Sequence, residues 1–160
     1  MAEPAFDELL RRLTDSDVDF VLIGGLALNA WGVIRGTKDL DIAADPDPEN
    51  LNRLARVAVG VGGQVQTRDA FASTPFSIAA LLATGQRVLI ETEMGPLDVV
   101  QGLPGVPSYR DLREGAEEVP VLGSTVRVCS LEHLRKMKRA AARGQDLVDL
   151  ESLEVAHPEE

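Results

Sequence analysis

Apolar residues in this chain follow two patterns, a helical spacing and short continuous runs bounded by turn-forming residues. The spacing of Phe6, Leu9, Leu10 and Leu13 predicts an amphipathic helix over residues 4–14. The short runs predict strands at 19–23, 39–43, 64–67, 87–92 and 97–100, with one or two more within 119–128. Capping residues and helical spacing predict further helices at 26–32, from Asp47 to the glycines near 60–63, at 75–82, at 109–114, from Ser130 to an interruption at Gly144, and at 146–154.

The order of these elements predicts the fold class. Glu93-Met94-Gly95-Pro96 is a turn signal between two predicted strands, so 87–100 is expected to be a hairpin, while 68–75 is expected to be a loop. Helices mixed with strands and a hairpin are typical of an α/β or α+β fold, with a mixed sheet flanked by helices. We expect a single compact domain over 1–153 and a flexible tail at 154–160.

Composition narrows the class of protein. A hydrophobic content of 44% is typical of a soluble globular domain, and a net charge of -10 argues against nonspecific coating of nucleic acid. No apolar run approaches membrane-spanning length, and Met1-Ala2-Glu3-Pro4 lacks a signal-peptide pattern, so we expect a cytoplasmic protein without membrane contact. The single cysteine, Cys129, excludes an internal disulfide and is expected to be a buried strand residue. Neither His133 nor His157 has a spacing typical of metal ligands.

The most informative segment joins a glycine turn to two carboxylates. Gly24 and Gly25 follow an apolar strand, and glycine lets a backbone approach a ligand closely, so a phosphate can sit where the next helix begins. Asp39 and Asp41 are two residues apart on a predicted strand, which places both side chains on one face of a sheet. Paired carboxylates beside such a turn favour a divalent-metal site for phosphoryl chemistry.

An Asp-x-Asp pair is weak evidence by itself, because the chain contains four of them. Asp15/Asp17 and Asp17/Asp19 precede a strand, and Asp45/Asp47 lies in a proline-containing loop, so turn and capping roles explain these pairs. Only the remaining pair lies inside an apolar strand after a Gly-Gly turn. The combination, rather than either part, therefore indicates a metal site.

Asp98 is the second informative carboxylate. It lies in Leu97-Asp98-Val99-Val100, a strand that should be buried, and an ionised carboxylate is costly to bury unless it is paired or bound to a cation. If this strand lies beside the strand at 39–43, three carboxylates converge, and two Mg²⁺ ions can relieve their repulsion. The alternative is an aspartate at a strand edge that faces water.

A basic stretch near the C-terminus is unusual in so acidic a chain. It contains Arg135, Lys136, Lys138, Arg139 and Arg143. Such a stretch can face phosphates, or it can be a solvated helix face that acidic residues elsewhere balance.

Together these residues resemble the nucleotidyltransferase superfamily, which includes the palm of DNA polymerase beta. The resemblance is carried by Gly24-Gly25, by Arg35-x-Thr37-x-Asp39-x-Asp41 and by the later Asp98. It is closest to the AbiEii/AbiGii toxin-like branch, whose C-terminal Lys…Arg-x-x-Asp-x-x-Asp-Leu element is similar to residues 138–150. The resemblance runs from about residue 19 to residue 153 and implies a nucleotidyltransferase-like mixed sheet.

The resemblance also implies site residues. Catalysis and the binding of two Mg²⁺ ions would fall to Asp39, Asp41 and Asp98, with Asp98 also helping to deprotonate the acceptor hydroxyl. Nucleotide binding would fall to Gly24, Gly25, Arg35, Thr37 and Lys138. Within this set the two glycines would hold the triphosphate and Lys138 would reach the phosphates, while Arg35 and Thr37 would brace the loop or touch the nucleotide. Structural pairing would be the role of Arg143, Asp146 and Asp149.

The implied activity is Mg²⁺-dependent transfer of a nucleoside monophosphate from an NTP to a hydroxyl acceptor, such as tRNA or a protein, with release of pyrophosphate. The resembling branch implies a toxin–antitoxin or phage-defence role with a cognate antitoxin. Since little follows residue 153, a homo-oligomer partner or a second protein is expected to help bind the acceptor. The alternatives are a small-molecule transferase of the aminoglycoside-modifying kind, which an acidic surface suits, and a noncatalytic nucleotide-binding module.

Overall fold

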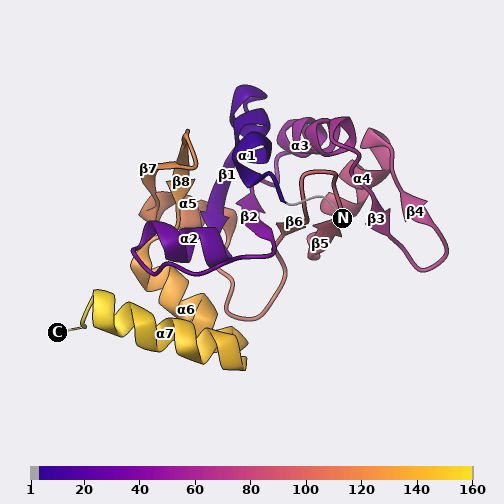
Figure 1. The fold of residues 1–160 in the computed structure, drawn as a ribbon. Helices are drawn as coiled ribbons and strands as arrows, with labels where there is room; N and C mark the ends of the chain where they lie inside the picture. Colours follow the sequence, from indigo (N-terminus) through magenta and orange to yellow (C-terminus); the bar gives the residue numbers. More distant parts are fainter. Residues whose placement is uncertain (1–3, 160) are drawn as a thin grey trace.

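The computed structural model describes residues 4–159 (Figure 1). Two parts of the chain lie outside this range: residues 1–3, at the N-terminus that lacks a signal-peptide pattern, and residue 160, at the end of the predicted tail. The helices are α1 (Phe6–Asp15), α2 (Gly24–Ala30), α3 (Pro48–Gly60), α4 (Pro75–Leu82), α5 (Tyr109–Gly115), α6 (Leu131–Ala141) and α7 (Gly144–Ala156). The strands are β1 (Phe20–Ile23), β2 (Leu40–Ala44), β3 (Val65–Gln66), β4 (Phe71–Ala72), β5 (Val88–Ile90), β6 (Leu97–Val99), β7 (Glu117–Val121) and β8 (Ser124–Val128).

Local signals in the sequence place the helix starts. The Asp47 side chain accepts a hydrogen bond from the N–H of Glu49 at 3.2 Å, and Pro48 is the first residue of α3. The Ser130 hydroxyl accepts a hydrogen bond from the N–H of His133 at 3.1 Å and caps α6. Both caps are those that the sequence predicts.

One mixed sheet organises the described residues, with strand order β5-β6-β2-β1-β8-β7. β1 pairs parallel with β8, and β2 pairs parallel with β6, whereas the pairs β1–β2, β5–β6 and β7–β8 are antiparallel. The predicted hairpin over 87–100 is therefore confirmed as β5–β6. In Figure 1, α1 and α3 lie above the sheet and α6 and α7 below it. The predicted single domain with a mixed sheet flanked by helices is confirmed.

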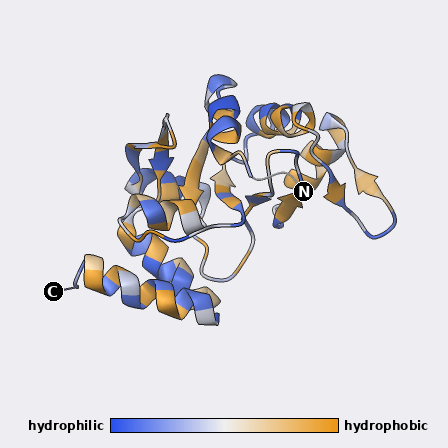
Figure 2. Cartoon of the chain, viewed as in Figure 1, coloured by the Kyte–Doolittle hydropathy of each residue, from blue (hydrophilic) through white to orange (hydrophobic). Residues whose placement is uncertain are grey.

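Apolar residues from the sheet and the helices form a continuous core. Leu22 of β1, Ile42 of β2 and Leu97 of β6 are fully buried, as are Leu9 and Leu13 of the amphipathic helix α1. Figure 2 shows the same division, with hydrophobic colour on central strands such as β1 and hydrophilic colour on the outer turns of α1. Burial of apolar surface on this scale is the main favourable term in the folding free energy.

The structure departs from the predicted elements in several segments. β2 begins at Leu40, so Asp39, predicted to lie in this strand, lies in the bend just before it. β4 lies within 68–75, which was expected to be a loop, and it pairs with β3 to form a separate two-stranded sheet. A strand of two residues is too short for alternation to reveal. α2 begins at Gly24 rather than at residue 26. α7 continues past residue 153 to Ala156, and the ring of His157 packs edge-on against Trp31 with ring centroids 5.5 Å apart.

Two expectations drawn from composition concern Cys129 and membrane spans. Cys129 is fully buried, as predicted, but it lies just after β8 rather than within a strand. Burial raises the pKa of its thiol to about 12. A thiol that stays protonated is a poor nucleophile. Among residues 4–159, no helix combines the length and apolar character that crossing a bilayer requires.

Candidate metal centre

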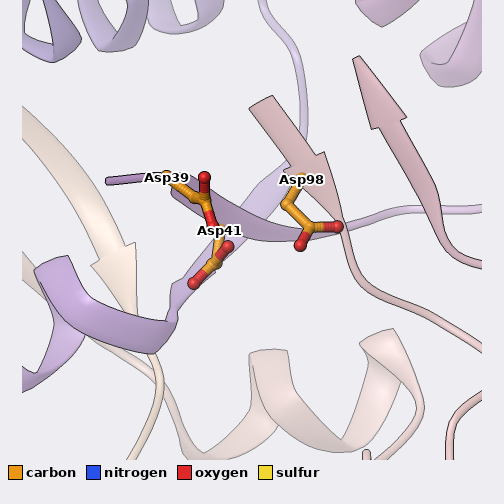
Figure 3. Close-up of side chains that lie close together, drawn as sticks. All are labelled: Asp39, Asp41 and Asp98. Carbon is orange, nitrogen blue, oxygen red and sulfur yellow. The ribbon is translucent and has the colours of Figure 1, made fainter. Parts of the chain in front are cut away.

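Three carboxylates meet on one face of the sheet, at the junction of β2 and β6. Asp41 and Asp98 are directly paired positions of these two parallel strands, so their side chains point the same way. Asp39 lies in the bend just before β2, and its carboxylate approaches the other two from there. One carboxylate oxygen from each of the three lies within 4.8 Å of those of the other two (Figure 3). The predicted convergence of the three is confirmed, and the alternative of a water-facing Asp98 is wrong, because this residue is only 5% exposed.

Gly24 and Gly25 make room for this cluster. Gly24 has a φ of +69°, and a Cβ atom there would lie 2.0 Å from Oδ2 of Asp41. A Cβ atom on Gly25 would lie 2.6 Å from the hydroxyl of Thr37, which itself donates a hydrogen bond to the carbonyl of Asp39 at 2.9 Å. The glycine turn thus lets β1 end directly against the carboxylates, and Thr37 braces the loop that enters β2.

The electrostatics of the cluster suit a divalent cation. Burial raises the pKa of Asp41 to about 7, and repulsion from Asp98 and Asp39 adds to this rise, while Lys138 and Arg87 oppose it. No described residue donates a hydrogen bond to the carboxylates of Asp39 or Asp41. Closely spaced carboxylate oxygens are the ligands that Mg²⁺ prefers, so these three residues fit the ion that the sequence predicts.

Arg87 is a site residue that the sequence reasoning missed. Its guanidinium donates to both carboxylate oxygens of Asp98, with Nε–Oδ1 at 2.9 Å, Nε–Oδ2 at 3.1 Å and Nη2–Oδ2 at 2.6 Å. The hairpin register contained the signal. Leu89 lies opposite Asp98, and alternation along β5 puts residue 87 on the same face as residue 89.

Lys138 is buried between two carboxylates from α7. Its ammonium lies 2.9 Å from Asp149 and 3.3 Å from Asp146. Asp149 also accepts two hydrogen bonds from Arg35, at 2.8 and 2.9 Å, and Asp146 accepts one from the Arg143 guanidinium at 2.9 Å. Burial raises the pKa of Asp149, but hydrogen bonds from Arg35, Lys138 and a neighbouring glutamine outweigh it and lower that pKa to about 2.

This network gives several predicted residues structural contacts. Arg143 pairs with Asp146, as the sequence suggests. Asp146 and Asp149 also pair with Lys138 of the basic helix. Arg35 ties the loop before β2 to α7. The network therefore links the loop that leads into β2 to the C-terminal helices.

A pocket of about 380 Å³ opens beside the carboxylates. The polar part of its lining includes Asp41, Asp98, Arg87 and Lys138, together with the backbone of Gly24. Its apolar wall comes from the loop after β6 and from α6, through Leu103, Pro104, Val106, Leu134 and Met137. The pocket volume lies within the range of small-molecule sites. Arg35 and Thr37 are not part of its lining.

Most of the basic stretch is already neutralised by acidic partners. Arg135 and Arg139 lie 3.3 and 2.9 Å from Glu159, and Lys138 and Arg143 are bound to aspartates of α7. Lys136 alone has no ion pair among the described residues. The reading of this stretch as a helix face balanced by acids is the one that the contacts support.

Comparison with known proteins identifies solved structures with a similar fold. No protein-family model matches the chain, and no curated protein matches it in sequence. Solved structures do match. The antibiotic-resistance factor ANT(2'')-Ia superimposes with a TM-score of 0.64 at 15% identity, over 94% of this chain and 81% of that one. The lincomycin-bound lincosamide antibiotic adenylyltransferase LnuA gives a TM-score of 0.65 at 15% identity, over 94% and 95%. An antigenic nucleotidyltransferase-like protein from Paracoccidioides brasiliensis gives 0.58 at 17% identity, over 92% and 72%. The chain thus has a nucleotidyltransferase-like fold, with three aspartates clustered at the junction of β2 and β6.

Proposed function

We propose that this protein is a Mg²⁺-dependent nucleotidyltransferase that moves a nucleoside monophosphate from an NTP to a hydroxyl acceptor and releases pyrophosphate. The observation that carries the proposal is the convergence of Asp39, Asp41 and Asp98 within 4.8 Å beside a glycine turn. The fold that the chain shares with nucleotidyltransferases supports the same reaction class.

Asp39, Asp41 and Asp98 would hold the divalent ions, which stabilise the negative charge that develops on the α-phosphate and on the leaving pyrophosphate. Asp98 would take the proton from the acceptor hydroxyl onto a carboxylate oxygen. The acceptor oxygen then forms a bond to the α-phosphorus as the bond from that phosphorus to the β-bridging oxygen breaks.

The remaining predicted residues support the nucleotide. We assign the triphosphate to the turn at Gly24 and Gly25, of which Gly24 lines the pocket beside Asp41. Lys138 lines the same pocket and would add positive charge near the phosphates while keeping its contacts with Asp146 and Asp149. Thr37 and Arg35 are assigned to the loop between α2 and β2, which they hold in place.

Two acceptor classes follow from different observations. The resemblance to the AbiEii/AbiGii toxin-like branch favours tRNA or a protein as acceptor, within a toxin–antitoxin or phage-defence system that includes a cognate antitoxin. The structure favours a small cationic acceptor. Basic residues of α6 are largely paired with acids, and a net charge of -10 attracts cations rather than polynucleotides. ANT(2'')-Ia and LnuA are described as an antibiotic-resistance factor and an antibiotic adenylyltransferase, which suits the small-molecule class.

In the experiment that tests this proposal, purified protein is incubated with Mg²⁺, each α-labelled NTP in turn and one acceptor class at a time. The acceptor classes are total tRNA, protein extract and an aminoglycoside panel. Label that enters a single class supports the activity and identifies the acceptor. The double variant Asp39→Ala/Asp41→Ala is the control and should transfer nothing. Label transfer by this variant equal to the wild type would refute the assigned metal site. Nucleotide binding without transfer to any acceptor would favour a noncatalytic module.

A further inference from the structure

Arg87 binds the carboxylate of Asp98. Of the three triad carboxylates, this is the one to which another described side chain donates hydrogen bonds. The two side chains share three hydrogen bonds of 2.6 to 3.1 Å, and both oxygens of Asp98 accept. A guanidinium that binds both oxygens of a carboxylate forms one of the stronger side-chain pairs in proteins. The pair is therefore a defined state of the metal-free site, rather than a loose surface contact.

A cation at the triad must compete with this pair. A carboxylate oxygen can accept more than one bond, but a divalent ion placed there would meet the positive guanidinium at short range. The cost of that repulsion falls if Arg87 moves away from Asp98. The side chain of Asp98 is only 7% exposed and belongs to a strand inside the sheet, so of the two partners it is Arg87 that can move.

The surroundings of Arg87 give it room to do so. Its side chain is 47% exposed and precedes β5, which is the last strand at its edge of the sheet. Arg87 lines the carboxylate pocket and also a second pocket of about 380 Å³, whose lining includes Gln66, Thr84 and Glu91. The guanidinium can thus leave Asp98 and still remain at the mouth of the carboxylate pocket.

We propose that Arg87 is an exchangeable counterion of Asp98. It neutralises that carboxylate in the metal-free protein, yields it to the divalent cation, and then binds a phosphate oxygen of the nucleotide. The guanidinium fork matches phosphate as well as it matches carboxylate. The phosphate part of this role rests on the proposed nucleotidyl transfer, whereas the competition with a cation does not.

The first test measures Mn²⁺ binding to the nucleotide-free protein by electron paramagnetic resonance, for the wild type, Arg87→Gln and Arg87→Lys. Removing a competing charged hydrogen-bond partner should tighten Mn²⁺ binding by about tenfold in Arg87→Gln. Arg87→Lys, which keeps the charge but loses the fork, should lie between the two. Arg11→Gln is the matched control, because Arg11 is also paired with carboxylates, on a helix that contributes no residue to the pocket. A purely structural Arg87 would leave Mn²⁺ affinity unchanged or weaken it.

The second test measures binding of an α,β-methylene ATP analogue, which resists transfer, at saturating Mg²⁺. Arg87→Gln should weaken this binding by about tenfold, and Arg87→Lys should restore part of it. Tighter Mn²⁺ binding with unchanged analogue affinity would overturn the phosphate role. Equal Mn²⁺ affinity in the wild type and Arg87→Gln would overturn the role of Arg87 while leaving the proposed function intact. Absence of Mn²⁺ binding in both proteins would overturn the metal centre, and with it both proposals.

Discussion

Replacing Asp41 by asparagine removes one of three crowded negative charges and keeps the size of the side chain. In the metal-free protein, burial and the neighbouring carboxylates raise the pKa of Asp41 from 3.8 to about 7. At 1.36 kcal/mol per pH unit, the rise corresponds to about 4 kcal/mol of unfavourable free energy when the carboxylate is ionised in the folded protein. Water that reaches the partly exposed side chain reduces this cost, and we expect about 2 kcal/mol.

The sign follows from proton binding. Between pH 3.8 and about 7 the folded protein binds more protons at Asp41 than the unfolded chain, so this group lowers the free energy of unfolding as pH rises through that window. Asp41→Asn lacks this carboxyl group, so its free energy of unfolding does not fall in this way as pH rises. In EDTA at about pH 8 the variant should therefore be more stable than the wild type, and at about pH 4 the difference should vanish.

Urea unfolding followed by circular dichroism, in EDTA and then in Mg²⁺, measures both effects. Mg²⁺ should stabilise the wild type and leave Asp41→Asn nearly unchanged, because a ligand stabilises only the state that binds it. Asp69→Asn, in the exposed loop between β3 and β4, is the matched control and should behave as the wild type does. Lower stability of Asp41→Asn in EDTA at the alkaline pH, or an equal gain from Mg²⁺ in both proteins, would refute the reasoning.

Other contacts make separate predictions. Gly24→Ala should lower the free energy of unfolding by about 1–2 kcal/mol, because alanine is strained in the left-handed backbone conformation. The added Cβ atom would lie 2.0 Å from Oδ2 of Asp41, so the variant should also lose stabilisation by Mg²⁺. A wild-type response to Mg²⁺ in thermal unfolding would contradict this. Asn50→Ala removes three hydrogen bonds of 2.7 to 2.9 Å to the backbone of Asp19 and Asp45. It should cost about 2–3 kcal/mol in urea unfolding, and an unchanged midpoint would show that water replaces the amide. Asp149→Asn weakens the pairs with Lys138 and Arg35 and should cost about 3 kcal/mol near neutral pH. The lowered pKa of Asp149 means that this loss should shrink as pH falls from 3.8 towards about 2, and a loss independent of pH would exclude the ionic origin.

Much of the fold could be predicted because the local signals agree with one another. The apolar run before Gly24, the cap at Asp47 and the turn at 93–96 each produced the expected element. β4 escaped prediction because two residues carry no period. The start of α2 escaped because a glycine at φ +69° can open a helix where its propensity argues against one.

The sequence predicts the three carboxylates of the triad, but it does not show which strand lies beside β6. Spacing along the chain keeps Asp39 close to Asp41, although Asp39 lies just before β2 rather than in it. Asp98 joins them only because β6 pairs with β2 in that register, a long-range choice that spacing does not encode. Arg87 shows the converse. Its position followed from a hairpin that was correctly predicted, yet a single arginine at a strand start carries no chemical signature.

The sequence suggests that Asp146 and Asp149 can pair with the basic helix, but not that Lys138 is the buried cation between them. Basic residues on one helix look available for phosphates until the partner helix is known, and here α7 supplies Asp146 and Asp149 to the buried ammonium. Charge patterning along a chain shows which residues can pair, whereas helix packing decides which do.

The most direct measurement of the central claim is the transfer of label from an α-labelled NTP, followed together with pyrophosphate release, for the wild type and Asp41→Asn in Mg²⁺ and in EDTA. The proposed function predicts one pyrophosphate released for each nucleotide transferred to a hydroxyl acceptor, with Mg²⁺ required and the variant inactive though folded. Transfer that persists in Asp41→Asn or in EDTA would contradict it, and so would hydrolysis of the NTP without any labelled acceptor.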